Sequence, residues 1–175
     1  EALASGMNYV FWSPFAKPLT AALRDEIRRD RDRLVIVGGA TLGFTRGAVR
    51  RGAERALRLL GTDHLDVFQI YWLGKMSAWT DGTRSEMVKL REEGKVRALG
   101  VSIHDRPRAG RLAEDSPLDL LMIRYNAAHP GAERDIFPHL ERRRPAVVAP
   151  PPPRWRTPPG APPGRGRPAA TPGDR

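Results

Sequence analysis

Three side chains that could take part in proton transfer follow predicted strands in the middle of the chain: Tyr71, Ser102 and His104. A phenol, a hydroxyl and an imidazole can each donate or accept a proton, so together they could support acid–base chemistry on a bound substrate. His104 is followed directly by Asp105, but adjacent residues rarely hydrogen-bond in a catalytic geometry. An enzyme built on these residues is therefore one hypothesis, and a Tyr71 ring that only fills space at a strand end is the favoured alternative.

Other motifs carry weaker signals. Residues 38–45, Gly-Gly-Ala-Thr-Leu-Gly-Phe-Thr, have the glycine spacing of a phosphate loop, but Phe44 stands where lysine is needed, which favours a tight turn after a strand. His64, His129 and His139 lack metal-ligand spacing, so no metal site is predicted. A last group of aromatic side chains could line a pocket together or simply pack at the mouth of the fold: Trp12, Trp72 and Trp79.

Alternating strands and helices must position these side chains. Apolar β-prone runs predict strands over residues 7–12, 34–37, 65–72, 96–102, 118–125 and 146–149, the second ended by Gly38-Gly39. Apolar residues at helical spacing predict helices over residues 19–29, 47–60, 83–91, 108–113 and 132–143, with Gly61 as a C-terminal cap. Such regular βα repetition requires a parallel sheet with right-handed crossovers, either a closed barrel or an open doubly wound sheet.

Composition limits the class of protein. The 175 residues are 40% hydrophobic, which suits one globular domain, and no run reaches the roughly 20 apolar residues of a membrane span. The chain opens on Glu1 without a recognisable secretory signal and contains no cysteine, which favours a cytoplasmic protein. The basic residues behind the net charge of +10 are interleaved with acids, as in residues 25–33, so the charge favours solubility over nucleic-acid binding.

The character of the chain changes at its C-terminal end. Ten of the 26 residues from Pro150 onward are proline, and most of the others are Arg, Gly, Ala or Thr. Proline blocks helix and central strand, so residues 150–175 are predicted to form a disordered tail beside a domain of residues 1–149. The tail could be a ligand for an aromatic groove, a passive extension, or the product of a shifted reading frame.

Two stretches identify a family. Residues 52–72 read Gly-Ala-Glu-Arg-Ala-Leu-Arg-Leu-Leu-Gly-Thr-Asp-His-Leu-Asp-Val-Phe-Gln-Ile-Tyr-Trp, and residues 93–102 read Glu-Gly-Lys-Val-Arg-Ala-Leu-Gly-Val-Ser. Both resemble the central barrel of the aldo/keto reductases, which are NADP-dependent oxidoreductases of small carbonyl substrates. The resemblance extends over residues 2–149 and implies an α/β fold, an incomplete (β/α)8 TIM-type barrel holding about strands two to seven. Because a full barrel takes about 250 residues, we expect this chain alone to be poorly stable.

The same resemblance implies that the catalytic residues of the family are missing. Phe11 stands where the family keeps its aspartate and Ala16 where it keeps its tyrosine. Gly38-Gly39 ends the strand that should carry the lysine, and Tyr71 replaces the histidine. No residue of this chain is therefore predicted to be catalytic in the family's reaction, and an inactive or divergent fragment, a pseudoenzyme, is expected.

Cofactor contacts are reduced in the same way. Ser102 is the one retained residue predicted to contact NADP, because Ile103 and Met122 replace the family's asparagine and glutamine. The alternative function is a non-catalytic binding module that acts through strand-end aromatic residues or the basic proline-rich tail.

Overall fold

The computed structural model describes residue 3 and residues 5–150. Strands alternate with helices in the order β1 (Tyr9–Phe11), α1 (Lys17–Arg29), β2 (Val35–Ala40), α2 (Arg46–Leu60), β3 (Leu65–Leu73), α3 (Asp81–Glu92), β4 (Val96–Ile103), α4 (Arg106–Asp115), β5 (Leu120–Ile123), α5 (Ala132–Asp135), the 3-10 helix η1 (Phe137–Leu140) and β6 (Ala146–Val148). No helix in this described part is long and apolar enough to cross a membrane. The predicted tail lies outside the described residues, except for Pro150.

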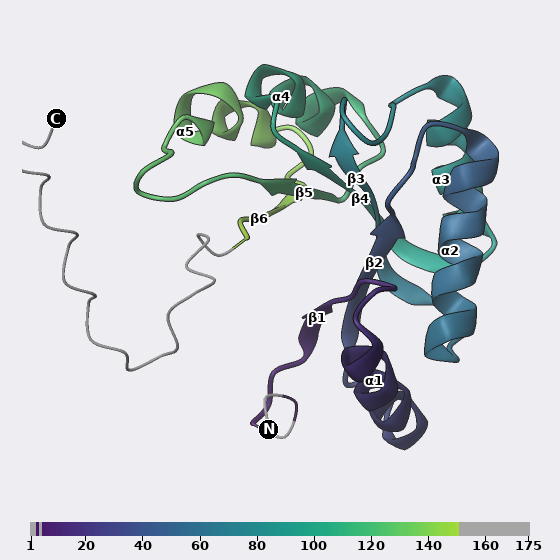
Figure 1. The fold of residues 1–175 in the computed structure, drawn as a ribbon. Coiled ribbons are helices and arrows are strands. Elements are labelled where there is room, and N and C mark those ends of the chain that lie inside the picture. Colours follow the sequence, from purple (N-terminus) through teal and green to yellow (C-terminus); the bar gives the residue numbers. More distant parts are fainter. Residues whose placement is uncertain (1–2, 4, 151–175) are drawn as a thin grey trace, which may run out of the picture.

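The six strands form one parallel sheet whose spatial order follows the sequence, β1-β2-β3-β4-β5-β6. A doubly wound sheet would reverse its strand order at a switch point and carry helices on both faces. Here the sheet curls in one direction with helices along its outer side (Figure 1). The fold is therefore an incomplete TIM-type barrel, as predicted, and the doubly wound alternative is wrong.

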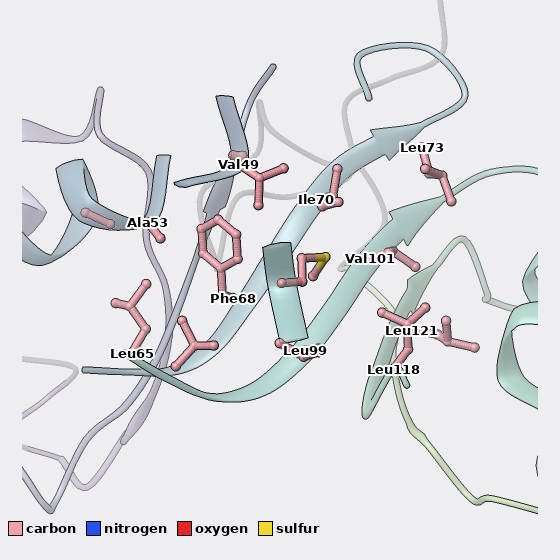
Figure 2. Packing of buried hydrophobic residues seen from close by; sticks show 14 of the residues in the cluster. Val49, Ala53, Leu65, Phe68, Ile70, Leu73, Leu99, Val101, Leu118 and Leu121 are labelled. Carbon is pink, nitrogen blue, oxygen red and sulfur yellow. The ribbon is translucent and has the colours of Figure 1, made fainter. Parts of the chain in front are cut away.

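The two faces of the sheet are covered differently. On the outer face, helix residues such as Val49 and Ala53 belong to one large apolar cluster with strand residues such as Phe68 (Figure 2). Leu23 and Leu90, from other helices, belong to the same cluster. The inner face carries a smaller cluster made only of strand residues: Val37, Val67 and Leu120, with Ala98, Met122 and Val148 beside them. Helix packing against the outer face therefore provides most of the buried apolar area.

Helix α2 shows how the sequence determines one of these elements. Val49, Ala53, Ala56 and Leu60 are buried at helical spacing, and the Thr45 side chain accepts a hydrogen bond from the Ala48 amide at the N-terminus. The helix ends at Gly61, which has φ of 70° in the left-handed region. The predicted glycine cap is confirmed.

Most predicted boundaries lie within two residues of the observed ones, and two elements differ by more. Strand β2 does not end at Gly38-Gly39 but continues to Ala40, because both glycines pair with β3, opposite Phe68 and Gln69. The single helix predicted over residues 132–143 is divided into α5 and η1. Pro138 has no amide hydrogen and its ring would clash with the carbonyl one turn earlier, so a continuous α-helix cannot pass through it.

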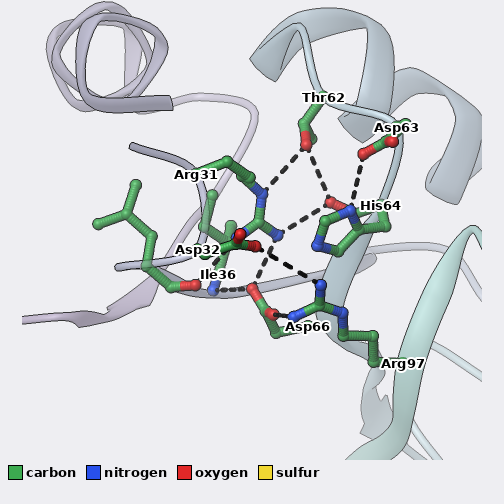
Figure 3. Close-up of polar contacts among 9 residues, drawn as sticks. Arg31, Asp32, Ile36, Thr62, Asp63, His64, Asp66 and Arg97 are labelled. Atoms are coloured by element: carbon green, nitrogen blue, oxygen red, sulfur yellow. Dashed lines mark hydrogen bonds and ion pairs between the residues drawn. The ribbon is translucent and has the colours of Figure 1, made fainter. Parts of the chain in front are cut away.

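A polar network lies at the N-terminal ends of the strands (Figure 3). The Asp66 carboxylate accepts hydrogen bonds from the Ile36 amide and the Arg31 guanidinium, both at 2.8 Å, and from Arg97 at 3.1 Å. Arg31 also donates to Thr62 and to the His64 carbonyl. These bonds connect the segment before β2 to β3 and β4, and they stabilise the end of the barrel opposite the strand C-termini.

Candidate functional site

The C-terminal ends of the strands lie along one edge of the parallel sheet, where barrels of this architecture place their functional groups. The residues at these ends are Phe11, Ala40, Leu73, Ile103, Ile123 and Val148. All six are apolar. Any polar chemistry at this edge must therefore come from side chains just before or after the ends.

The rings of Phe11 and Tyr71 are in contact at this edge, with centroids 5.5 Å apart and planes tilted by 48°. The Tyr71 hydroxyl donates a hydrogen bond of 3.4 Å to the Trp12 carbonyl. Burial, and to a smaller extent the neighbouring Tyr9 phenol, raises the pKa of Tyr71 well above its usual value. Tyr71 is therefore a neutral phenol across the ordinary pH range.

Tyr71 also fills space that a side chain at position 39 would need. A Cβ atom added to Gly39 would lie 2.6 Å from the Tyr71 ring carbon Cζ and 2.4 Å from the Gln69 carbonyl oxygen. Both distances are too short for carbon in a packed structure, so only glycine fits here. The interpretation of Tyr71 as a ring that fills the mouth of the barrel agrees with this geometry.

Ser102 lies near the end of β4, opposite Met122 of β5, and is 9% exposed. By strand alternation its side chain belongs to the inner face, together with Gln69 and Tyr71 of the neighbouring strand. The structure therefore places Ser102 close to the strand ends, as predicted. Its role as a cofactor contact stays a prediction.

Sequence reasoning missed Gln69, which is fully buried on the inner face. In the described part of the chain neither its amide nitrogen nor its amide oxygen has a hydrogen-bond partner. The side chain lies over Gly100, where an added Cβ would be 2.8 Å from Gln69 Cγ. The signal was available in the sequence, because Gln69 is an uncharged polar residue within the apolar run of β3.

His104 and Asp105, the adjacent residues weighed as an acid–base pair, do not contact each other through their side chains in the described residues. The Asp105 carboxylate caps α4 by accepting a hydrogen bond of 3.0 Å from the Arg108 amide. Across residues 3 and 5–150, no hydrogen bond or ion pair of the His104 ring is found. Tyr71, Ser102 and His104 are thus not joined into a catalytic arrangement by direct contacts.

Two of the three remaining histidines and the glycine-rich segment have structural partners. His64 contacts Asp63 at 2.7 Å and His139 contacts Glu114 at 2.9 Å, and the described residues contain no group of three or more His, Cys, Asp or Glu side chains that could hold a metal ion. In the glycine-rich segment, the Gly43 amide donates to the Met76 carbonyl. That amide is therefore not free to bind a phosphate.

The three tryptophans have different surroundings. Trp12 is buried on the helix side, where its indole nitrogen donates to the Thr20 hydroxyl at 2.9 Å. Trp79 is partly buried against the outer core, whereas Trp72 is 49% exposed and has a positive φ of 46°. No ring contact joins any two of them among residues 3 and 5–150. Together they do not line one pocket.

Comparison with known proteins agrees with the resemblance. The sequence profile described as "Aldo/keto reductase family" matches residues 15–149. The aldo-keto reductase YhdN of Bacillus subtilis is 25% identical over 120 residues, covering 63% of this chain and 36% of the relative. The methylglyoxal reductase YeaE of Escherichia coli is 29% identical over 99 residues, covering 55% and 34%. The chain thus spans about a third of the length of these curated relatives.

Solved structures match over more of the chain. An aldo-keto reductase from Klebsiella pneumoniae in complex with NADPH superimposes with a TM-score of 0.69 at 24% identity, covering 85% of this chain and 54% of the other. A structure from the same organism in complex with NADP and acetate gives a TM-score of 0.67 at 25% identity, covering 85% and 54%. The fold is shared with both of these proteins.

Proposed function

Because the chain belongs to the aldo/keto reductase family, we propose that it retains the scaffold of these oxidoreductases without their carbonyl-reducing chemistry. The observation that carries the proposal is the apolar contact between Phe11 and Tyr71 at the strand ends. By resemblance, these two positions belong to the aspartate and the histidine of the family. The phenyl ring of Phe11 cannot ionise, and the phenol of Tyr71 is partly buried.

Tyr71 is also unsuited to replace the missing proton donor. A general acid works best when its pKa lies near the working pH. The pKa of Tyr71 is raised by burial, and its hydroxyl is directed to the Trp12 carbonyl. Since Gly39 has no space for a lysine beside this ring, no cation at that position lowers the pKa of the phenol.

The residues at the expected nicotinamide site do not fit the cofactor. A carboxamide requires donors and acceptors, and of the three positions implied by the resemblance only Ser102 has a polar side chain. Ile103 and Met122 have none that can form a strong hydrogen bond. NADP binding at the strand ends is therefore expected to be weak or absent, and no reaction step is assigned to it.

Activity and binding should be tested separately. Purified protein is mixed with NADPH and methylglyoxal, the substrate named for one relative, and loss of NADPH absorbance is followed. The Escherichia coli methylglyoxal reductase serves as the positive control. We expect no turnover above the rate without protein. Turnover by this chain that Tyr71→Phe abolishes would overturn the proposal and favour the altered enzyme built on Tyr71, Ser102 and His104.

NADPH titration with tryptophan fluorescence tests the cofactor. We expect no saturable quenching that depends on Ser102. Quenching that Ser102→Ala removes would show that a cofactor site at the strand ends is retained.

A further inference from the structure

A pocket of about 610 Å³ opens beside the C-terminal ends of β1 and β2, bordered by α2. This volume lies within the range of small-molecule sites, about 300 to 1,000 Å³. Of the described residues, fourteen line it, and these include three arginines and neither aspartate nor glutamate. We call it the arginine pocket, after its charged residues Arg51, Arg55 and Arg58.

The three arginines form a row on one face of α2, because their spacing of four and three residues matches the helical repeat. All three are exposed, and within the described part of the chain none has a hydrogen bond or ion pair. Arg50 of the same helix, by contrast, pairs with Glu86 and Glu93. The row therefore presents positive charge that no described residue neutralises.

The N-terminus of α2 adds to this positive potential. Aligned peptide dipoles place partial positive charge at the start of a helix, where acidic residues are favoured. The first turn of α2 contains no acidic residue, and Ala48, also near the helix start, lines the pocket. An anion beside Ala48 and Arg51 would be stabilised by the dipole as well as by the guanidinium, whereas Arg58 lies in the last turn, beyond the reach of this effect.

Apart from Thr41, the other described residues that line the pocket are apolar. Phe15 is 76% exposed and Leu42 is 58% exposed at its rim, and the buried Trp12 forms part of its wall. Large apolar side chains exposed together beside a concave site are typical of ligand-binding surfaces. A ligand that fits therefore combines an anionic group with an apolar body.

We propose that the arginine pocket binds an organic phosphate, with the phosphate against the arginine row and an apolar or aromatic group against Phe15 and Leu42. Guanidinium groups match phosphate oxygens in paired hydrogen bonds, which makes arginine the preferred residue for such recognition. The hollow shape favours a small molecule over a flat membrane surface. This site lies on the helix side of the rim and does not depend on the proposed loss of reductase chemistry.

Calorimetric titration with 1-naphthyl phosphate tests the proposal. We expect one site per chain, and binding at least about tenfold weaker in the double variant Arg51→Ala/Arg55→Ala, the effect of losing charge-assisted hydrogen bonds. The matched control is Arg111→Ala/Arg143→Ala, which removes the same charge from two exposed arginines that do not line the pocket. Circular dichroism checks that both variants are folded. Equal weakening in both variants would contradict the proposal, because net charge alone would then explain binding.

Three further probes separate the alternatives. Inorganic phosphate that binds as tightly as 1-naphthyl phosphate would exclude a role for the apolar wall, and neutral 1-naphthol that does so would exclude a role for the arginines. Binding to phosphatidylserine vesicles without binding of 1-naphthyl phosphate would overturn the proposal in favour of a membrane surface. NADPH serves as one more probe. If NADPH binding is lost in Arg51→Ala/Arg55→Ala but not in Ser102→Ala, NADPH binds in the arginine pocket, and the proposed function is unaffected.

Discussion

Phe11 and Tyr71 pack ring against ring at the strand ends, 5.5 Å between centroids, although they come from strands separated by β2. The contact is possible because the strand between them carries Gly39, whose missing side chain leaves room for the tyrosine ring. Three of the four positions implied by the resemblance are thus coupled by packing. Restoring one catalytic residue alone would not restore the site.

Titration of Tyr71 is expected to lower stability at high pH. Its pKa is raised in the folded state, so the unfolded chain loses its proton first, near pH 10. The contribution of Tyr71 to the free energy of unfolding is complete below about pH 10 and is lost as the pH rises toward the folded pKa. The free energy of unfolding, measured with urea from neutral to alkaline pH, should therefore fall more steeply with pH for the wild type than for Tyr71→Phe. Parallel curves for the two proteins would contradict this assignment.

Gly39→Ala should destabilise the protein by about 1 to 3 kcal/mol, the usual effect of overpacking a core. The added methyl would collide with the Gln69 carbonyl and the Tyr71 ring. Gly82→Ala is the control, because in α3 the nearest atom to its added Cβ is Thr80 Oγ1 at 3.7 Å. Alanine has the higher helix propensity, so this control should be neutral or stabilising by up to about 1 kcal/mol. Thermal unfolding compares the two variants.

Gln69→Met is predicted to stabilise the protein by about 1 to 2 kcal/mol, since it removes a buried amide without a partner in the described residues and keeps most of the volume. Gln69→Ala should instead destabilise it, because it leaves a cavity. Urea denaturation of both variants provides the measurement. A destabilised Gln69→Met protein would show that the amide is bonded in solution.

Asp66→Asn should lower the free energy of unfolding by about 3 kcal/mol, because it leaves the largely buried Arg31 without its counter-charge. Asp119→Asn is a matched control. Asp119 likewise accepts from a strand amide, Leu99, and from an arginine, Arg91, but its side chain is 39% exposed. Solvent screening should limit its cost to about 1 kcal/mol. Urea denaturation measures both variants. Similar losses of unfolding free energy in the two would show that burial is not what makes the Asp66 ion pair important for stability.

The sequence predicted the order of strands and helices because apolar runs and helical periodicity are local signals. Pro138 was an equally local signal that a long helix could not form, and it was overlooked. The orphaned amide of Gln69 and the collision at Gly39 could not be predicted, since both depend on the register between strands. The arginine row was visible in the sequence at helical spacing. Its interpretation as a binding site depends on the lack of carboxylates among the described residues that line the pocket, which only the fold reveals.

The lengths of the strands determine which parts of the sheet unfold locally most easily. The interior strands β3 and β4 have nine and eight residues, whereas the outermost β1 and β6 have three each and are hydrogen-bonded to a neighbouring strand on one side within the described residues. Amide hydrogen exchange should accordingly be slowest at the middle of the sheet and fastest at its margins. Short edge strands also offer few unpaired backbone groups to a strand of another chain, which limits the growth of intermolecular fibrils.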